Sequence, residues 1–350
     1  MRIVITGNMG YVGPIVTQHL RNRFPDSTLV GVDVGFFGHC LAGARSLPES
    51  IVDIQHFSDV RDVDASILDG ADALVMLAAI SNDPMGKAFE AVTAEINRDA
   101  CVRLTEIARD KGVGRVVFAS SCSVYGFAEG GAKKEEDELD PLTAYARSKV
   151  DTEKAICDLA NEKTLITCLR FPTACGMSPR IRLDLVLNDF VASAVATGKI
   201  QILSDGSPWR PLIDIRDMAR AIEWAIVREA ESGGQFIAIN AGRDESNHQV
   251  RALAEAVKEV MPSVDIEINQ DAQPDRRSYQ VDFGRYRELA PNHLPAVSLA
   301  ESIKLLRDGL EQMDFSDSEF RDSGFMRLKV LSGLRESGLL NERLKWTHAR

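Results

Sequence analysis

A glycine-rich segment directly after the first apolar run constrains the fold most. Arg2–Thr6 is predicted to be a buried strand; Thr6-Gly7-Asn8-Met9-Gly10-Tyr11-Val12-Gly13 follows it and opens a segment of helical period, Ile15–Arg23. Glycines here allow a tight turn and let backbone N–H groups approach a pyrophosphate at the helix N-terminus. The spacing is GxxGxxG rather than GxGxxG, so a glycine turn without a ligand stays an alternative on this motif alone.

Asp33 ends the second predicted strand, Thr28–Asp33, about 20 residues beyond the last glycine of the turn. An acid at this position can hold the hydroxyls of an adenosine ribose. It would repel a 2′-phosphate, and no Lys or Arg follows before Arg45 to bind one. The glycine turn and Asp33 together therefore predict NAD in preference to NADP.

The rest of the first two-thirds of the chain alternates strand-like and helix-like segments. Strands are expected at Ile51–Gln55, Ala73–Leu77, Arg115–Ala119 and Thr164–Leu169, and helices at Ala88–Asp110 and Ala144–Asn161. Such alternation is typical of a parallel sheet whose two faces are covered by helices. We therefore predict the α/β class, with a Rossmann-type doubly wound parallel sheet in an NAD-binding domain of residues 1–172.

Beyond residue 172 the pattern is less regular. Strands are expected at Ile200–Leu203, Phe236–Asn240 and Asp265–Asn269, and helices at Leu183–Ala196, Ile215–Arg228, Gln249–Val260 and Leu299–Gln312. We expect residues 173–312 to form mainly a smaller, substrate-binding lobe, with some elements returning to the sheet. Residues 313–350 are predicted to be a helical extension that packs against the body or a partner subunit. Ala128–Asp140 is rich in Gly and acids and is predicted to be a surface loop.

Charge and cysteine content narrow the class of protein. A formal net charge of −11 argues against a broad surface for nucleic acid or an anionic membrane. Six scattered cysteines without a CxxC pair indicate reduced intracellular thiols, and no His/Cys spacing indicates a metal site. Neither a signal peptide nor an apolar run of about 20 residues is recognisable. These observations predict a cytoplasmic protein without a membrane span.

Tyr145 and Lys149 lie four residues apart at the start of a predicted helix. This spacing puts both side chains on one face. A phenol, whose unperturbed pKa is about 10, is a poor base at neutral pH. The ammonium of Lys149, helped by the positive charge of a nicotinamide, is expected to lower the pKa of Tyr145 towards the working range. An isolated YxxxK is usually a solvated helix face, and that alternative stays open on this motif alone.

Ser121 follows a predicted strand, in Phe118-Ala119-Ser120-Ser121-Cys122-Ser123. Ligands of open α/β sheets bind along the carboxyl edge of the strands. A hydroxyl there can donate a hydrogen bond to a substrate oxygen while Tyr145 removes its proton. The alternative is a serine-rich turn that only satisfies backbone groups.

Together, these ordered motifs resemble the extended short-chain dehydrogenase/reductase family, especially its nucleotide-sugar epimerases and dehydratases, over roughly residues 1–310. The resemblance implies that Ser121, Tyr145 and Lys149 are the catalytic triad and that Tyr145 and Lys149 also contact the cofactor. The resemblance also implies further cofactor contacts. These are Gly7, Gly10 and Gly13 at the pyrophosphate, Met9, Tyr11 and Val12 of the same turn, Asp33 at the adenosine ribose, Asp59 and Val60 at the adenine, Leu77, Ala78 and Ala79 beneath the cofactor, the structural helix asparagine Asn97, and Phe171 and Thr173 beside the nicotinamide.

The resemblance also implies a nucleotide-diphosphate sugar as substrate. The implied substrate contacts are Ser81, Ser123, Asn188, Arg210 and Arg277. A guanidinium group is the natural bidentate ligand of a phosphate, although two surface arginines are individually unremarkable.

The chain departs from its family in several positions. The family's 4,6-dehydratases usually carry Asp-Glu directly after the catalytic hydroxyl, where this chain has Cys122 and Ser123. Neither replaces that acid–base pair well. Thr173 stands where relatives often have an asparagine that contacts substrate. Cys175 and Arg180 lie nearby, and the sequence assigns them no role.

We therefore expect an NAD-dependent nucleotide-sugar epimerase that acts through a transient keto-sugar. Reduction, oxidation, 4,6-dehydration and decarboxylation by the same type of site are the alternatives. A protein that binds the dinucleotide without catalysis is a remote one, because a pure binder need not keep Ser121, Tyr145 and Lys149. A homodimer is expected through Ala88–Asp110 and Ala144–Asn161, the helices that relatives pair across a two-fold axis.

Overall fold

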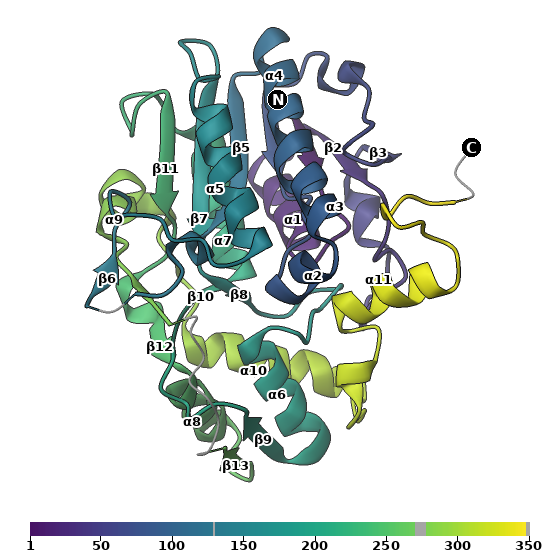
Figure 1. The fold of residues 1–350 in the computed structure, drawn as a ribbon, viewed down its shortest axis with the longest axis vertical. Coiled ribbons are helices and arrows are strands. Elements are labelled where there is room, and N and C mark those ends of the chain that lie inside the picture. The colour runs from purple at the N-terminus through teal and green to yellow at the C-terminus, as the bar shows by residue number, and fades with distance from the viewer. Residues whose placement is uncertain (129, 270–277, 348–350) are drawn as a thin grey trace.

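A seven-stranded parallel sheet forms the centre of the molecule in the computed structural model, which describes residues 1–128, 130–269 and 278–347 (Figure 1). The sheet confirms the predicted Rossmann-type α/β fold. In spatial order its strands are Phe236–Asn240 (β11), Leu165–Phe171 (β7), Arg115–Ser121 (β5), Ala73–Met76 (β4), Arg2–Thr6 (β1), Thr28–Asp33 (β2) and Ile54–Phe57 (β3).

Helices cover both faces of this sheet because side chains alternate along each strand. Ile3 and Ile5 of β1 pack in one cluster with Val16 and Leu20, whereas Val4 packs in a second cluster with Leu104. The first face carries Gly13–Arg23 (α1) and Ile215–Val227 (α7), and the second carries Ala100–Asp110 (α4) and Ala144–Cys157 (α5).

A second group of elements gathers at one end of the sheet (Figure 1). Its larger members are Val186–Thr197 (α6), Lys199–Ile202 (β9), Val250–Val260 (α8), Asp265–Ile268 (β13) and Leu299–Gln312 (α10). A small sheet beside it contains Thr173–Cys175 (β8), Trp209–Asp214 (β10) and Asn247–Gln249 (β12). The strand β11 comes from the same stretch of sequence but pairs with β7 in the central sheet, so the domain boundaries at 172 and 312 stay a prediction.

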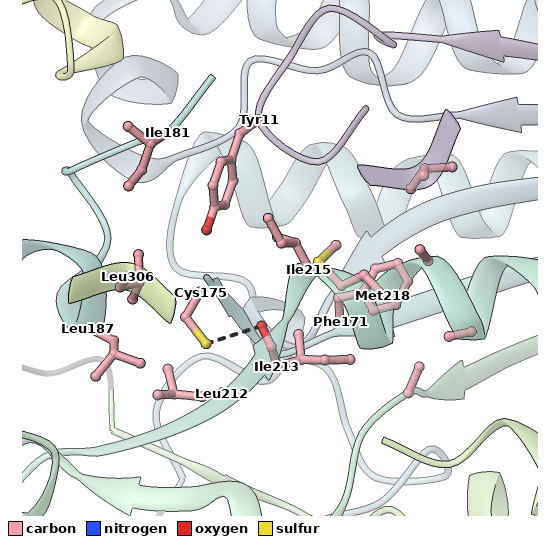
Figure 2. Close-up of a cluster of buried hydrophobic side chains, with 14 of the residues drawn as sticks. Tyr11, Phe171, Cys175, Ile181, Leu187, Leu212, Ile213, Ile215, Met218 and Leu306 are labelled. Atoms are coloured by element: carbon pink, nitrogen blue, oxygen red, sulfur yellow. Dashed lines mark hydrogen bonds between the residues drawn. The ribbon is translucent and has the colours of Figure 1, made fainter. Parts of the chain in front are cut away.

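One continuous apolar cluster joins this second group to the sheet (Figure 2). Phe171, from the end of β7, packs in it with Leu187 and Leu306, from α6 and α10. In Figure 2 the Cys175 side chain points towards the backbone oxygen of Ile213, to which its thiol donates at 3.5 Å. The cluster fixes the second group against the carboxyl ends of the strands.

Shorter elements complete the described part of the chain. They are Pro48–Ile51 and Ala65–Leu68 (3-10 turns), Asp83–Ala88 (α2), Glu90–Ala94 (α3), Glu95–Asp99 (a π-helical turn), Cys122–Tyr125 (a 3-10 turn), Ala132–Lys133 (β6), Asp244–Ser246 (a 3-10 turn), Gln280–Val281 (β14), Gly284–Leu289 (α9), Pro291–His293 and Phe320–Asp322 (3-10 turns) and Arg327–Glu336 (α11). None of the described helices has the length and apolar character to cross a bilayer.

Three predicted elements differ in the structure. The expected buried strand Ile51–Gln55 is instead the edge strand β3, displaced towards Phe57 and largely exposed, because Pro48–Ile51 forms a 3-10 turn before it. The expected helix Ala88–Asp110 begins at Glu90 and contains a π-helical turn. Part of the expected loop Ala128–Asp140 forms β6, which pairs with β14.

Candidate active site

A cavity of about 830 Å³ lies at the carboxyl ends of the central strands. Its volume is within the range of pockets that hold cofactors and small ligands. Residues that follow β1, β2, β4, β5 and β7 line it together with the start of α5 and residues of the second group. Of the predicted site residues, the wall contains Gly7, Gly10, Tyr11, Val12, Gly13, Asp33, Asp59, Val60, Leu77, Ala78, Ala79, Ser81, Ser121, Ser123, Tyr145, Lys149, Phe171, Thr173 and Arg210.

The glycine turn has the geometry that a dinucleotide requires. Gly7 has a φ of +78°, and a Cβ on it would lie 2.4 Å from the backbone nitrogen of Ala78. A Cβ on Gly13 would lie 2.3 Å from the backbone oxygen of Asn8. No side chain caps the N-terminus of α1 at Val12. Pro14 has no N–H and Ile15 donates to the backbone oxygen of Val12 at 3.1 Å, so in the described structure the N–H of Gly13 is the first-turn donor left for an anion such as a pyrophosphate.

Asp33 projects from the end of β2 into the same cavity. Its carboxylate accepts hydrogen bonds from the backbone N–H groups of Met9 (3.0 Å) and Gly35 (2.8 Å), which fix its orientation. Burial raises the pKa of Asp33, while these two hydrogen bonds lower it. Each oxygen of a carboxylate offers two acceptor positions, so capacity remains for ribose hydroxyls.

Ser121, Tyr145 and Lys149 meet on one part of the wall. Tyr145 and Lys149 lie on successive turns of α5, whose N-terminus is capped by Thr143. Lys149 is only 3% exposed, and its Nζ donates to the backbone oxygen of Ala119 at 2.7 Å. The same Nζ lies 5.6 Å from the ring centre of Tyr145. The structure thus brings the three residues together as predicted.

The pKa of Tyr145 is high in the protein alone. Burial raises it to about 12, although a hydrogen bond with Ser121 and the charge of Arg182 act in the opposite direction. Burial also lowers the pKa of Lys149 to about 8. In the protein alone, desolvation of the phenol outweighs the nearby charges; the expected lowering of the Tyr145 pKa concerned the site with its nicotinamide bound, so it stays a prediction. A lower pKa requires additional positive charge from bound cofactor.

A buried ionic network lies next to the active-site wall and includes Ser120, the neighbour of Ser121 in β5. Glu153 of α5 accepts from the Ser120 hydroxyl at 2.5 Å and from Arg170 at 2.7 Å. Glu153 is 4% exposed and Arg170 is 5% exposed. Arg170 also donates to the hydroxyl of Tyr125 at 3.0 Å. Sequence reasoning missed this network, because its members come from separate strands and helices and form no local motif.

The two residues that replace the dehydratase acid–base pair behave differently. The Cys122 side chain is completely buried, donates to the backbone oxygen of Arg170 at 3.1 Å, and has a pKa that burial raises well above its usual value. The Ser123 hydroxyl lies on the cavity wall and donates to that of Ser121 at 2.9 Å. Cys122 therefore does not reach the cavity, and Ser123 supplies a hydroxyl in place of a carboxylate.

A second network, also missed from the sequence, crosses the opposite wall. Arg182 donates to the Ser81 hydroxyl at 2.8 Å and forms an ion pair with Asp184 at 2.8 Å. Asp184 in turn accepts from the side-chain amide of Asn82 at 2.6 Å. The network joins the loop after β4 to the segment before α6. The only sequence signal was the pair of charges in Arg182-Leu183-Asp184 within an otherwise apolar stretch.

Several of the predicted site residues do not line the cavity, and one lies outside the residues that the structure describes. Asn97 is buried and hydrogen-bonds both backbone groups of Ile80, which fits the predicted structural role. Asn188 is fully buried and bonds to Tyr11, Gly176 and Arg182. Its direct contact with substrate stays a prediction. Met9 acts on Asp33 through its backbone, and Arg277 lies outside the described residues.

Cys175 and Arg180 also lie away from the chemistry. Cys175 belongs to the apolar cluster described above, and burial raises its pKa well above the usual value. The Arg180 side chain is fully buried and forms an ion pair with Glu49 at 2.5 Å. Both residues therefore contribute to packing and pairing inside the protein and do not line the cavity.

Known proteins resemble this chain in sequence and in fold. The model of the NAD dependent epimerase/dehydratase family matches residues 3–242. An uncharacterised UDP-glucose epimerase of Bacillus subtilis (strain 168) is 27% identical over 73% of this chain and 82% of its own length. A dTDP-glucose 4,6-dehydratase of Streptomyces griseus is 27% identical over 86% of this chain and 91% of its own. The solved structure of MoeE5 with UDP-glucuronic acid and NAD has a TM-score of 0.76 at 23% identity, covering 89% of this chain and 99% of that one.

Proposed function

The chain belongs to the NAD-dependent epimerase/dehydratase family, and we propose that it epimerises the sugar of a nucleotide-diphosphate sugar through a transient keto-sugar. The observation that carries the proposal is the composition of one wall of the cavity. Ser121, Tyr145 and Lys149 stand on it, whereas Cys122, at the first dehydratase position, is buried behind it. The site therefore has the groups for removal and return of a hydroxyl proton, but at the two dehydratase positions it has a buried thiol and a hydroxyl in place of carboxylates.

In this proposal each residue of the triad has a distinct role. Tyr145 removes the proton of a sugar hydroxyl and later returns it. Ser121, which hydrogen-bonds Tyr145, orients the reacting oxygen. Lys149, buried beside Tyr145, contributes positive charge that stabilises the phenolate. Bound NAD supplies a reversible hydride acceptor, so inversion of the carbon proceeds without net redox change.

The cofactor would lie along the predicted contacts that line the cavity. The glycine turn binds the pyrophosphate, Asp33 the adenosine ribose, and Asp59 and Val60 the adenine. Asn97 acts indirectly, by holding Ile80 behind the strand end Leu77–Ala79. Ser81, Ser123 and Arg210 are the proposed substrate contacts on the wall, while Asn188 and Arg277 complete the predicted set. We also propose that the chain acts as a homodimer in the cytoplasm.

Mass spectrometry of the nucleotides released from purified protein first identifies candidate substrates. The test then uses NMR to monitor the conversion of these nucleotide sugars. Deuterium placed at the oxidised carbon reports the fate of the hydride. Epimerisation predicts a product inverted at that carbon that keeps its deuterium. Accumulation of NADH with a net oxidised sugar would mark a dehydrogenase, and loss of water or of carbon dioxide would mark a dehydratase or a decarboxylase.

The Tyr145→Phe variant tests the catalytic assignment itself. It keeps the ring and removes one oxygen, so we expect normal folding and NAD binding with a rate lower by about 10² to 10⁴. Ser121→Ala should cost less, because it removes an orienting hydrogen bond and not the base. Tyr286→Phe is the matched control, since Tyr286 is buried and donates its hydroxyl to the backbone oxygen of His293. An unchanged rate in Tyr145→Phe would refute the assignment.

A further inference from the structure

The C-terminal segment reaches the cavity through the start of α11. Arg327 is the first residue of this helix, and both Met326 and Arg327 line the cavity. Arg327 is only 2% exposed. The family model ends at residue 242, well before this helix. The wall thus contains a buried arginine that none of the motifs above includes.

Arg327 lacks a carboxylate partner within the described chain. Its Nη2 donates to the backbone oxygens of Arg180 (2.7 Å) and Ile181 (3.3 Å), and its guanidinium carbon lies 4.7 Å from the ring centre of Phe37. Its Nη1 is buried without a hydrogen-bond partner among the residues that the structure describes. The neighbouring arginines differ: Arg180 pairs with Glu49, and Arg182 pairs with Asp184.

The surroundings of Arg327 disfavour its charge. Burial, the largest cause, and the charges of Arg182 and Arg180 lower its pKa to about 10, although Cys40 and Asp184 act in the opposite direction; the side chain is still protonated at pH 7. The nearby Cys40 is no counter-ion, because burial raises the pKa of its thiol and keeps it neutral. Arg327 also stands at the N-terminus of a helix, where the dipole favours anions. An anion at this point would relieve all three unfavourable effects.

The position of Arg327 within the cavity indicates which anion it binds. On one side it stacks on Phe37, which follows the ribose-binding Asp33 closely in the chain. On the other side the charges of Arg182 and Asp184 affect the pKa of Arg327, and the charge of Arg182 also affects the pKa of Tyr145. Arg327 therefore lies between the adenosine end and the catalytic end of the cavity, where a dinucleotide carries its two phosphates. We propose that Arg327 binds the pyrophosphate of NAD opposite the glycine turn, so that the C-terminal segment completes the cofactor site.

This inference rests on the cofactor placement in the proposed function. Calorimetry on the whole chain distinguishes failure of the Arg327 contact from failure of the cofactor site. The ligands are adenosine, ADP-ribose, NAD and NADP, together with UDP added to NAD-saturated protein. For Arg327→Met we expect affinities for ADP-ribose and NAD at least tenfold weaker, with those for adenosine and UDP within twofold of the unmodified protein. Arg327→Lys, which keeps the charge and loses the planar fork, should give an intermediate loss.

Arg335→Met is the matched control, since Arg335 is an exposed residue of the same helix that stacks on Phe89 and lies off the cavity wall. It should leave all affinities unchanged. Unaltered ADP-ribose binding by folded Arg327→Met would overturn the proposal, as would a loss confined to UDP or to NADP. If Arg327→Met does not fold, Arg327→Lys decides by the same criteria. Failure of the unmodified protein to bind ADP-ribose or NAD would instead refute the cofactor site itself.

Discussion

Replacement of Lys149 by methionine should stabilise the nucleotide-free protein while abolishing its proposed chemistry. Lys149 is 3% exposed, and its Nζ donates a hydrogen bond to the backbone oxygen of Ala119. Burial lowers its pKa from 10.5 to about 8, so folding is disfavoured whenever the unfolded chain carries this proton. Methionine has a similar length and no charge to desolvate. The active site therefore contains a group that costs stability, as functional residues often do.

The magnitude follows from the pKa. Each pKa unit is worth about 1.4 kcal/mol, so a fall from 10.5 to about 8 disfavours folding by about 3 kcal/mol at pH 7. Loss of the hydrogen bond to Ala119 offsets about 1 kcal/mol of the gain in the variant. We expect Lys149→Met to be about 2 kcal/mol more stable than the unmodified protein at pH 7.

The pH dependence gives the sharper test. Between pH 8 and pH 10.5 the unfolded chain binds the Lys149 proton more strongly than the folded chain, so the unmodified protein gains stability as pH rises, relative to the variant. Urea unfolding followed by circular dichroism should show the advantage of Lys149→Met shrinking between pH 7 and pH 10. Lys154→Met, which changes an exposed lysine of the same helix, should show no such trend. A difference between Lys149→Met and the unmodified protein that stays constant over this range would refute the reasoning.

Two further predictions concern the cofactor and assembly. The unmodified protein should bind NAD more than tenfold more tightly than NADP, because a buried like-charge contact costs more than about 1.4 kcal/mol. Calorimetry should find a smaller difference between the NAD and NADP affinities in Asp33→Ala. Equal affinities of the unmodified protein for NAD and NADP would contradict the assignment. Light scattering should find a homodimer through α4 and α5, with the loop 128–140 outside the interface, and a monomer at micromolar concentration would count against it. The apolar residues of α4 and Ile156 of α5 pack on the core, so such an interface would use outward positions such as Asp151 and Lys154.

The sequence was sufficient for the parts of the site that depend on local spacing. The glycine turn follows a strand, Asp33 and Ser121 each end one, and the carboxyl ends of parallel strands meet at one edge of a sheet. Tyr145 and Lys149 lie on one face of a helix because they are four residues apart. These relations are fixed by the periodicity of the elements, so no knowledge of distant contacts was needed.

The remaining features depend on contacts between distant parts of the chain. Arg182 and Asp184 are recognisable as a network only when Ser81 and Asn82 are placed beside them. The high pKa of Tyr145 reflects burial by many elements, which its spacing from Lys149 does not report. The C-terminal segment that contains Arg327 was expected to serve packing, because it has no motif and the cavity is formed mainly by residues far earlier in the chain.

The pairing of β11 with β7 has a consequence for synthesis on the ribosome. All seven residues of β7 are buried in the folded protein, and residues 172–235 must be made before β11 can cover its outer edge. During translation the nascent chain therefore exposes an apolar, unpaired strand edge, which is a template for association with other chains. Ribosome pausing within residues 172–235 should prolong this exposure and increase aggregation. Holdase chaperones should accordingly bind nascent chains that end before β11 more strongly than chains that extend beyond it.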